Sequence, residues 1–155
     1  MLIKLTMVLK QIRYVVYVKY EFFWLGNMKG NPVMTREENV FLAKKIFVEL
    51  VYNTAYIEGC NVTFPQTQTI IDGAVVNGVS VDDIQTVLNL RDGWKYMMNS
   101  LDEPLSLEYI CKVNEFVSRN ESLKWGVLRD GIVGVGEFVP AIPEREEVLK
   151  RIEKN

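Results

Sequence analysis

Three residues near the end of an expected helix, Thr54, Glu58 and Gly59, form the pattern in this chain with the clearest chemical meaning. Residues four apart on a helix lie on the same face, so the Thr54 hydroxyl and the Glu58 carboxylate are expected to be neighbours. A carboxylate at the C-terminal end of a helix meets the negative end of the helix dipole, which disfavours it. That mismatch favours a specific role for Glu58 over a merely solvated one.

The residue types that the chain lacks narrow its chemistry. The 155 residues include no histidine and two cysteines, Cys60 and Cys111. Two cysteines without histidine cannot form an ordinary tetrahedral zinc site within one chain, so no metal ligands are expected. Because nothing in the sequence has the pattern of an export signal, we expect two reduced core thiols and a cytoplasmic location.

Further motifs follow the first one in order along the chain. Thr63 lies four residues after Gly59, and Asn89 lies in the polar and apolar stretch 83–90. A Gly-x-x-Arg step then ends at Arg129, and a glycine-rich apolar stretch leads from it to Pro140. The glycines do not form a phosphate-binding loop, because no Gly-x-x-x-x-Gly-Lys-Ser/Thr pattern is present.

Together these motifs resemble the Fic family of protein adenylyltransferases, enzymes that transfer AMP from ATP to a hydroxyl group of a protein. The resemblance spans about residues 40–152. It implies that Thr54, Glu58 and Gly59 belong to the inhibitory helix of that family, and that Asn89 and Arg129 are structural. The chain departs from the family pattern at three positions, where Asn, His and Pro are usual: Cys60, Asn114 and Ala141.

The glycine-rich stretch reads as a β-hairpin with close turns, since β-branched residues alternate with glycine. In the resemblance this hairpin is the flap, whose exposed edge holds a segment of the target protein as an added strand. The residues expected to form that docking edge are Ile132, Val133, Gly134, Val135 and Phe138. A core hairpin without a partner is the alternative.

The catalytic loop of the family, His-Pro-Phe…Gly-Asn-Gly-Arg, is missing from the sequence. That loop supplies the base, the anion-binding backbone and the arginines of the reaction, so we assign no catalytic residue and expect no activity of this chain alone. ATP and Mg are implied for the complete family domain and not for this chain. The resemblance implies that Glu58 pairs with the second arginine of the loop and thereby excludes the γ-phosphate.

The elements that must position these residues are mainly helices. Thr35 and Glu38 form a capping box, and the apolar spacing after them predicts one helix to about residue 57. Further helices are expected at 63–73, from Ser80 to a break at 102–104, from Ser106 through 117, and at 144–154. The expected fold is thus a mainly α, incomplete Fic-like domain at 34–155 with one β-hairpin.

Residues 1–27 differ in character from the rest. They are rich in β-branched and aromatic residues, read as strand, and carry four basic residues and one acidic residue. Charges interrupt them too often for a membrane span of about 20 apolar residues. An upstream extension with a mis-assigned start and a genuine edge hairpin both remain open. The other residues hold fourteen basic and nineteen acidic side chains, which argues against nucleic acid as a partner.

Three functions are compatible with these features. The first is the N-terminal portion of a Fic-type adenylyltransferase, whose missing part would follow Asn155 and whose partner is a protein target segment at the flap. The second is a binding module that acts in trans, like an antitoxin, on a separate Fic protein; a second copy of the chain is the other partner considered. In the third, an unrelated helical domain, the motif matches are coincidence.

We predict that this chain alone transfers no AMP to protein, because it has neither the histidine nor the Gly-Asn-Gly-Arg loop. The measurement is incubation of the purified chain with α-labelled ATP, Mg and cell lysate. A labelled protein band that depends on the chain, and disappears when the chain is omitted, would contradict the prediction.

Overall fold

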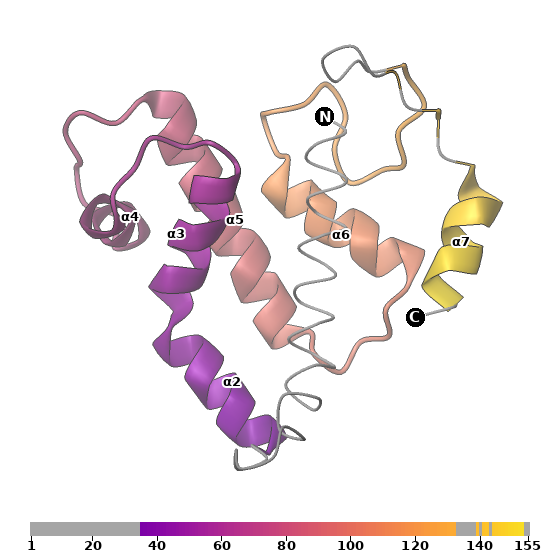
Figure 1. Cartoon of the computed structure of the whole chain (residues 1–155), viewed down its shortest axis with the longest axis horizontal. Coiled ribbons are helices and arrows are strands. Elements are labelled where there is room, and N and C mark those ends of the chain that lie inside the picture. Colours follow the sequence, from indigo (N-terminus) through magenta and orange to yellow (C-terminus); the bar gives the residue numbers. More distant parts are fainter. Residues whose placement is uncertain (1–34, 133–138, 140, 143, 154–155) are drawn as a thin grey trace.

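The computed structural model describes residues 35–132, 139, 141–142 and 144–153. Within this part the chain forms helices and no strands, which confirms the expectation of a mainly helical protein. The expected strand-like segment 1–27 and residues 133–138 of the expected hairpin lie outside the described residues. The helices, labelled in Figure 1, are α2 (Arg36–Lys45), α3 (Phe47–Ile57), α4 (Phe64–Ile71), α5 (Val81–Asn99), α6 (Leu107–Val117) and α7 (Arg145–Glu153).

The helices begin where their capping residues predict. The Thr35 hydroxyl accepts from the Glu38 amide at 3.2 Å, and the Glu38 carboxylate accepts from the Thr35 amide at 2.7 Å. Thr63 forms a second such box with Gln66. Ser80 and Ser106 are the N-caps of α5 and α6, as expected. Each cap satisfies an otherwise orphaned amide and contributes about 1 kcal/mol.

The sequence predicts one helix over 35–57, but the structure divides it into α2 and α3 at Ile46. That residue has φ −96° and ψ 18°, which is outside the helical range. The Ile46 amide still donates to the Leu42 carbonyl, and the Ile46 carbonyl still accepts from the Leu50 amide. The break is therefore a local kink in an almost continuous ladder of hydrogen bonds. It lies at a β-branched residue, a type that helices tolerate less well.

Helix α5 is the centre of the fold. It packs against α3 and α4 on one side and against α6 on the other, and Figure 1 shows it between these elements. The buried apolar side chains of α3, α4, α5 and α6, together with one from the loop before α4, form one cluster around it. The cluster consists of Val51, Ala55, Val62, Ile70, Val87, Leu90, Trp94, Met97, Tyr109, Ile110, Val113 and Val117.

Gly93 allows α5 and α6 to approach closely, as its position in the expected helix suggests. A Cβ atom built on Gly93 would lie 2.7 Å from Cγ1 of Val117, closer than two carbon atoms tolerate. Val117 is buried and β-branched, so its side chain has little freedom to rotate away. Glycine at this position therefore sets the distance between α5 and α6.

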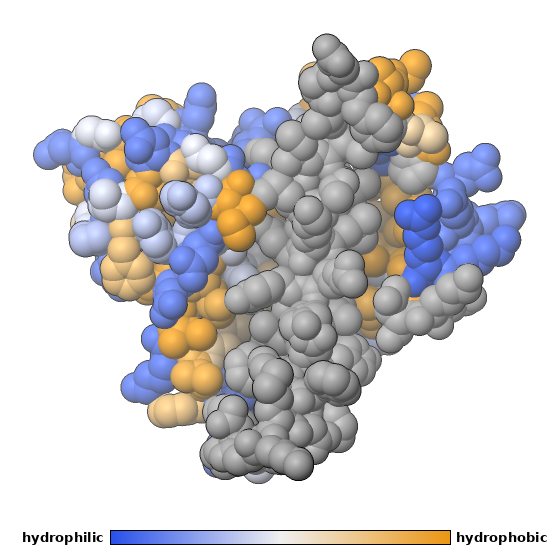
Figure 2. Space-filling model, viewed as in Figure 1, coloured by the Kyte–Doolittle hydropathy of each residue, from blue (hydrophilic) through white to orange (hydrophobic). Residues whose placement is uncertain are grey.

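Helix α7 lies at the edge of the described structure. Its first turn is acidic and its last turn is basic, the arrangement that the helix dipole favours. Arg145 contacts Glu108 of α6 at 3.2 Å, and Ile152 packs against the core cluster. The outward face of α7 is hydrophilic in Figure 2. None of the described helices combines the length and the apolar character needed to cross a lipid bilayer.

We predict that Gly93→Ala lowers the free energy of unfolding by about 1–2 kcal/mol, because overpacking against Val117 outweighs the gain in helix propensity of about 1 kcal/mol. The measurement is urea unfolding followed by circular dichroism. In a Val117→Ala background the clash is gone, and the same substitution should be neutral or stabilising. Equal stability of Gly93→Ala and wild type in the unaltered background would contradict the close-packing argument.

Candidate functional site

The C-terminal end of α3 carries the three residues of the expected inhibitory motif. Gly59 adopts φ +85°, a conformation that glycine adopts without strain. Its amide donates to the Tyr56 carbonyl, and the Cys60 amide donates to the Ala55 carbonyl. These two bonds form a Schellman motif, which stops the helix at a defined residue. Glu58 is consequently the C-cap, with its own amide bonded to the Thr54 carbonyl.

Thr54 is a buried anchor of this helix. Its hydroxyl donates to the Leu50 carbonyl at 2.7 Å and accepts from Nε1–H of Trp94 on α5 at 3.1 Å. Thr54 is 6% exposed and Trp94 is equally buried. The bond to Trp94 joins α3 to the central helix, so the Thr54 hydroxyl fixes the position of α3 on α5 rather than the helix end itself.

The surface around Glu58 combines acidic and apolar groups. Glu58 is half-buried, whereas Tyr56 and Ile57 beside it are 69% and 59% exposed. Cys60 follows within the same turn, and its thiol lies near Asp83 in the first turn of α5. Burial first, and then the negative charge of Asp83, raise the pKa of the Cys60 thiol to about 11. The thiol is therefore protonated at neutral pH and is a poor nucleophile.

Cys111 is the second free thiol of the chain. Burial, followed by the charge of Glu108, raises its pKa above the ordinary value. Both thiols are partly buried. Among the described residues, no three groups of the metal-ligating types His, Cys, Asp and Glu gather where they could hold an ion.

Asn89 is a buried clamp between α5 and the segment after α6. Its Nδ2 donates to the Arg119 carbonyl at 2.7 Å and to a Glu121 carboxylate oxygen at 2.9 Å. Its Oδ1 accepts from Nε2 of Gln85 one turn earlier at 2.9 Å. With 4% exposure, Asn89 thus satisfies its amide entirely inside the protein. The side chain holds residues 119–121 against α5.

Arg129 ties together two parts of the chain that are twelve residues apart. Its side chain is buried, with 8% exposure, and donates to the carbonyls of Gly131 and Ala141. These carbonyls stand on either side of the segment expected to form the flap. Of the expected docking residues, Ile132 is 78% exposed, and Val133, Gly134, Val135 and Phe138 lie outside the described residues. Residues 125–132 form bends and irregular backbone rather than strand.

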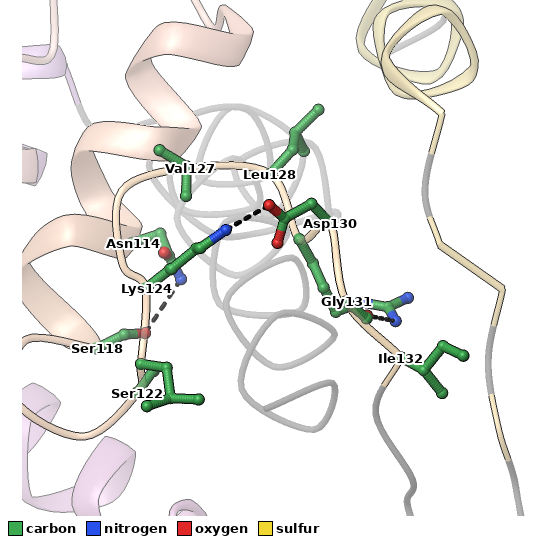
Figure 3. Close-up of a pocket in the computed structure, with 11 residues that line it drawn as sticks. Asn114, Ser118, Ser122, Lys124, Val127, Leu128, Asp130, Gly131 and Ile132 are labelled. Carbon is green, nitrogen blue, oxygen red and sulfur yellow. Dashed lines mark hydrogen bonds and ion pairs between the residues drawn. The ribbon is translucent and has the colours of Figure 1, made fainter.

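A pocket of about 220 Å³ opens between the end of α6 and residues 122–132. Figure 3 shows Lys124 and Asp130 pointing toward one another at this pocket, and they form an ion pair. The hydrogen bond that Lys124 donates within this pair, followed by its positive charge, lowers the pKa of Asp130. Most of the surface that lines the pocket is apolar, including Val127 and Leu128.

Asn114 organises the wall of this pocket that belongs to α6. Its Oδ1 accepts from the Gly126 amide at 2.9 Å, and its Nδ2 donates to the Ser118 hydroxyl at 3.1 Å. The side chain therefore holds the 122–132 segment against the helix. The sequence pattern indicated Asn114 only as a departure from histidine, and neither this bond nor the one between Thr54 and Trp94 was expected. Polar residues on the otherwise apolar face of a helix are the signal that points to such contacts.

The structure brings the sequence-predicted residues together in two groups. Thr54, Glu58 and Gly59 share the end of α3, while Asn89 and Arg129 hold the segment that follows α6. Comparisons of the chain with protein-family models, with curated proteins and with solved structures find no match. The roles of the end of α3 and of the segment after α6 are therefore inferred from their residues and contacts.

We predict that Thr54→Val lowers the free energy of unfolding by about 1–3 kcal/mol, because it keeps the shape of the side chain but leaves the buried Trp94 N–H without an acceptor. Chemical denaturation followed by tryptophan fluorescence measures the change. Thr69→Val is the matched control: its hydroxyl also bonds a carbonyl one turn back, at Pro65, but no tryptophan depends on it. Equal losses in the two variants would contradict a special role for the bond to Trp94.

Proposed function

We propose that this chain is the regulatory and framework portion of a Fic-type adenylyltransferase domain, at 34–155, and that Glu58 is its inhibitory group. The observation that supports this most is the position of Glu58 in the last turn of α3, a helix whose end and whose place on α5 are both fixed by hydrogen bonds. The Schellman motif at Gly59 fixes where the helix ends, and the Thr54–Trp94 bond fixes the helix on α5. A carboxylate held on such a rigid end is suited to pair with one arginine.

In this proposal Glu58 acts as a brake by charge pairing. An arginine of the loop that the sequence lacks would donate two parallel bonds to the Glu58 carboxylate. The same arginine is the one that the γ-phosphate needs, so the two anions compete for it. The half-buried setting of Glu58 strengthens such a pair relative to one in open solvent.

In this proposal ATP and Mg are bound by the complete domain, where the missing loop supplies the anion-binding backbone and the arginines. No step of the transfer is assigned to this chain.

We further propose that residues 132–138 form the flap and receive the target protein as an added strand. The support is the pair of bonds by which Arg129 holds Gly131 and Ala141, since they join the two sides of the segment at its base. Ile132 and Val139 are 78% and 61% exposed and leave apolar surface for a partner at both sides.

A second candidate function is inhibition in trans of a separate Fic protein. Tyr56 and Ile57 favour it, because two large exposed side chains flank Glu58 and would be covered by a partner helix or loop. In that case the chain would bind its partner through the end of α3. The large framework formed by α5 and α6 is better explained by the first candidate.

We predict that Glu58→Gly raises autoadenylylation at least tenfold once the catalytic loop is restored, by fusing the loop segment of a Fic protein after residue 155. A tenfold change corresponds to about 1.4 kcal/mol of relieved competition. Glu58→Gln should act in the same direction, since it removes the charge and keeps the shape. The readout is incorporation of α-labelled AMP.

Glu49→Gln is the matched control for this experiment, because Glu49 is an exposed glutamate of the same helix. Thr54→Ala is less suitable, since it also removes the acceptor of the buried Trp94 N–H. Equal activity of wild type, Glu58→Gly and Glu49→Gln in the restored protein would reject an inhibitory role for Glu58.

A further inference from the structure

The pocket beside α6 contains a buried positive charge whose counter-ion is not among the described residues. Three charged side chains line it, namely Lys124, Arg129 and Asp130. Lys124 and Asp130 neutralise each other as an ion pair. Among the described residues, Arg129 donates hydrogen bonds to the main-chain carbonyls of Gly131 and Ala141, and no carboxylate pairs with it. The lining therefore carries one net positive charge.

The guanidinium group of Arg129 also has unused donors. It has five N–H groups, and its bonds to the carbonyls of Gly131 and Ala141 use one from Nη1 and one from Nη2. Its Nε is buried and has no hydrogen-bond partner. A buried donor on a charged group is costly to leave unsatisfied, because it has lost its water and gained nothing in return. Because Nε is closed off from solvent, an anion in the pocket would accept from the remaining N–H groups of Nη1 and Nη2.

The other residues that line the pocket indicate the size and polarity of the rest of the ligand. Val127, Leu128 and Ile132 give the pocket a mainly apolar surface, and the hydroxyl of Ser122 is a further polar group at its edge. The volume of about 220 Å³ lies below the range of drug-sized pockets. One net charge matches a monoanion better than a phosphate dianion. In Figure 3 the labelled side chains surround this space from the α6 side and from the 122–132 segment.

From these observations we propose that the pocket binds a small monocarboxylic acid with an apolar body, its carboxylate accepting from Arg129 and its body lying against Val127 and Leu128. This site is independent of the function proposed for Glu58, which belongs to the end of α3. Binding there would also stabilise the 122–132 segment, because Arg129 already ties that segment to Ala141.

The test uses the full chain and sodium benzoate as the probe, with binding followed by calorimetry and by amide shifts in ¹H–¹⁵N spectra. We expect saturable binding with shifts concentrated at residues 122–132. Benzamide has the same shape without the charge and should bind at least tenfold more weakly. Equal binding of benzamide would overturn the proposal, and so would inorganic phosphate binding as tightly as benzoate.

Two variants test separately how the charge of Arg129 and the space of the cavity contribute to benzoate binding. Arg129→Gln should weaken benzoate binding at least tenfold, but it also removes the ties to Gly131 and Ala141. Val127→Trp fills the pocket and leaves Arg129 in place; Val127 is 53% exposed, so the larger ring is tolerated. It should abolish binding without unfolding the chain. Val75→Trp, at a 90% exposed position far along the sequence, is the control and should bind like wild type.

A carboxylate of the chain itself is the alternative occupant. Glu137, eight residues after Arg129 in the sequence and outside the described residues, is tested by Glu137→Gln. Benzoate binding that is the same in wild type and in Glu137→Gln supports an external ligand. Binding that is absent in wild type and gained in Glu137→Gln would assign the site to the chain's own carboxylate and overturn the proposal. Absence of binding in both proteins would overturn it as well.

Discussion

Two adjacent residues of α5, Gly93 and Trp94, set the spacing of the whole core. Neighbouring residues of a helix point about 100° apart, so they face different partners. Gly93 admits Val117 of α6, and Trp94 reaches across to Thr54 of α3. A side chain at the first position would push α6 away, and a smaller one at the second would release α3. The positions of α6 and α3 against α5 thus depend on two adjacent residues of α5.

The buried polar residues of the protein have a common purpose. Thr54, Asn89 and Arg129 each connect segments that are distant in the sequence. Asn89 and Arg129 donate to main-chain carbonyls, and the Thr54 hydroxyl accepts from the indole N–H of Trp94. Such bonds specify one arrangement, because a shifted helix or loop would leave a buried donor without a partner. Apolar contacts alone would tolerate small slips. The end of α3 and the 122–132 segment are therefore placed by polar contacts upon an apolar core.

Much of this fold can be predicted from the sequence, for local reasons. Thr35, Thr63, Ser80 and Ser106 mark helix starts because capping depends on residues three positions apart, which a single sequence displays. The kink at Ile46 could not be predicted, since the apolar spacing continues through it. The bond from Trp94 to Thr54 spans forty residues, and the Arg129 ties depend on where a loop returns. Such contacts follow from the three-dimensional packing, not from spacing. The roles of Glu58 and of the flap residues stay predictions.

The kink at Ile46 has a consequence for how the molecule opens. Helix α2 has no buried residue, and the ion pair from its Arg36 to Asp102, in the turn after α5, lies at the surface and contributes little. Beyond the kink, α3 is bound to the core by Val51, Thr54 and Ala55. The amides of α2 should therefore exchange with solvent through local openings, while those of α3 exchange only with global unfolding. Among the described residues, we expect the cooperative unit to begin at Phe47, so that the end of α3 keeps its place while α2 unwinds.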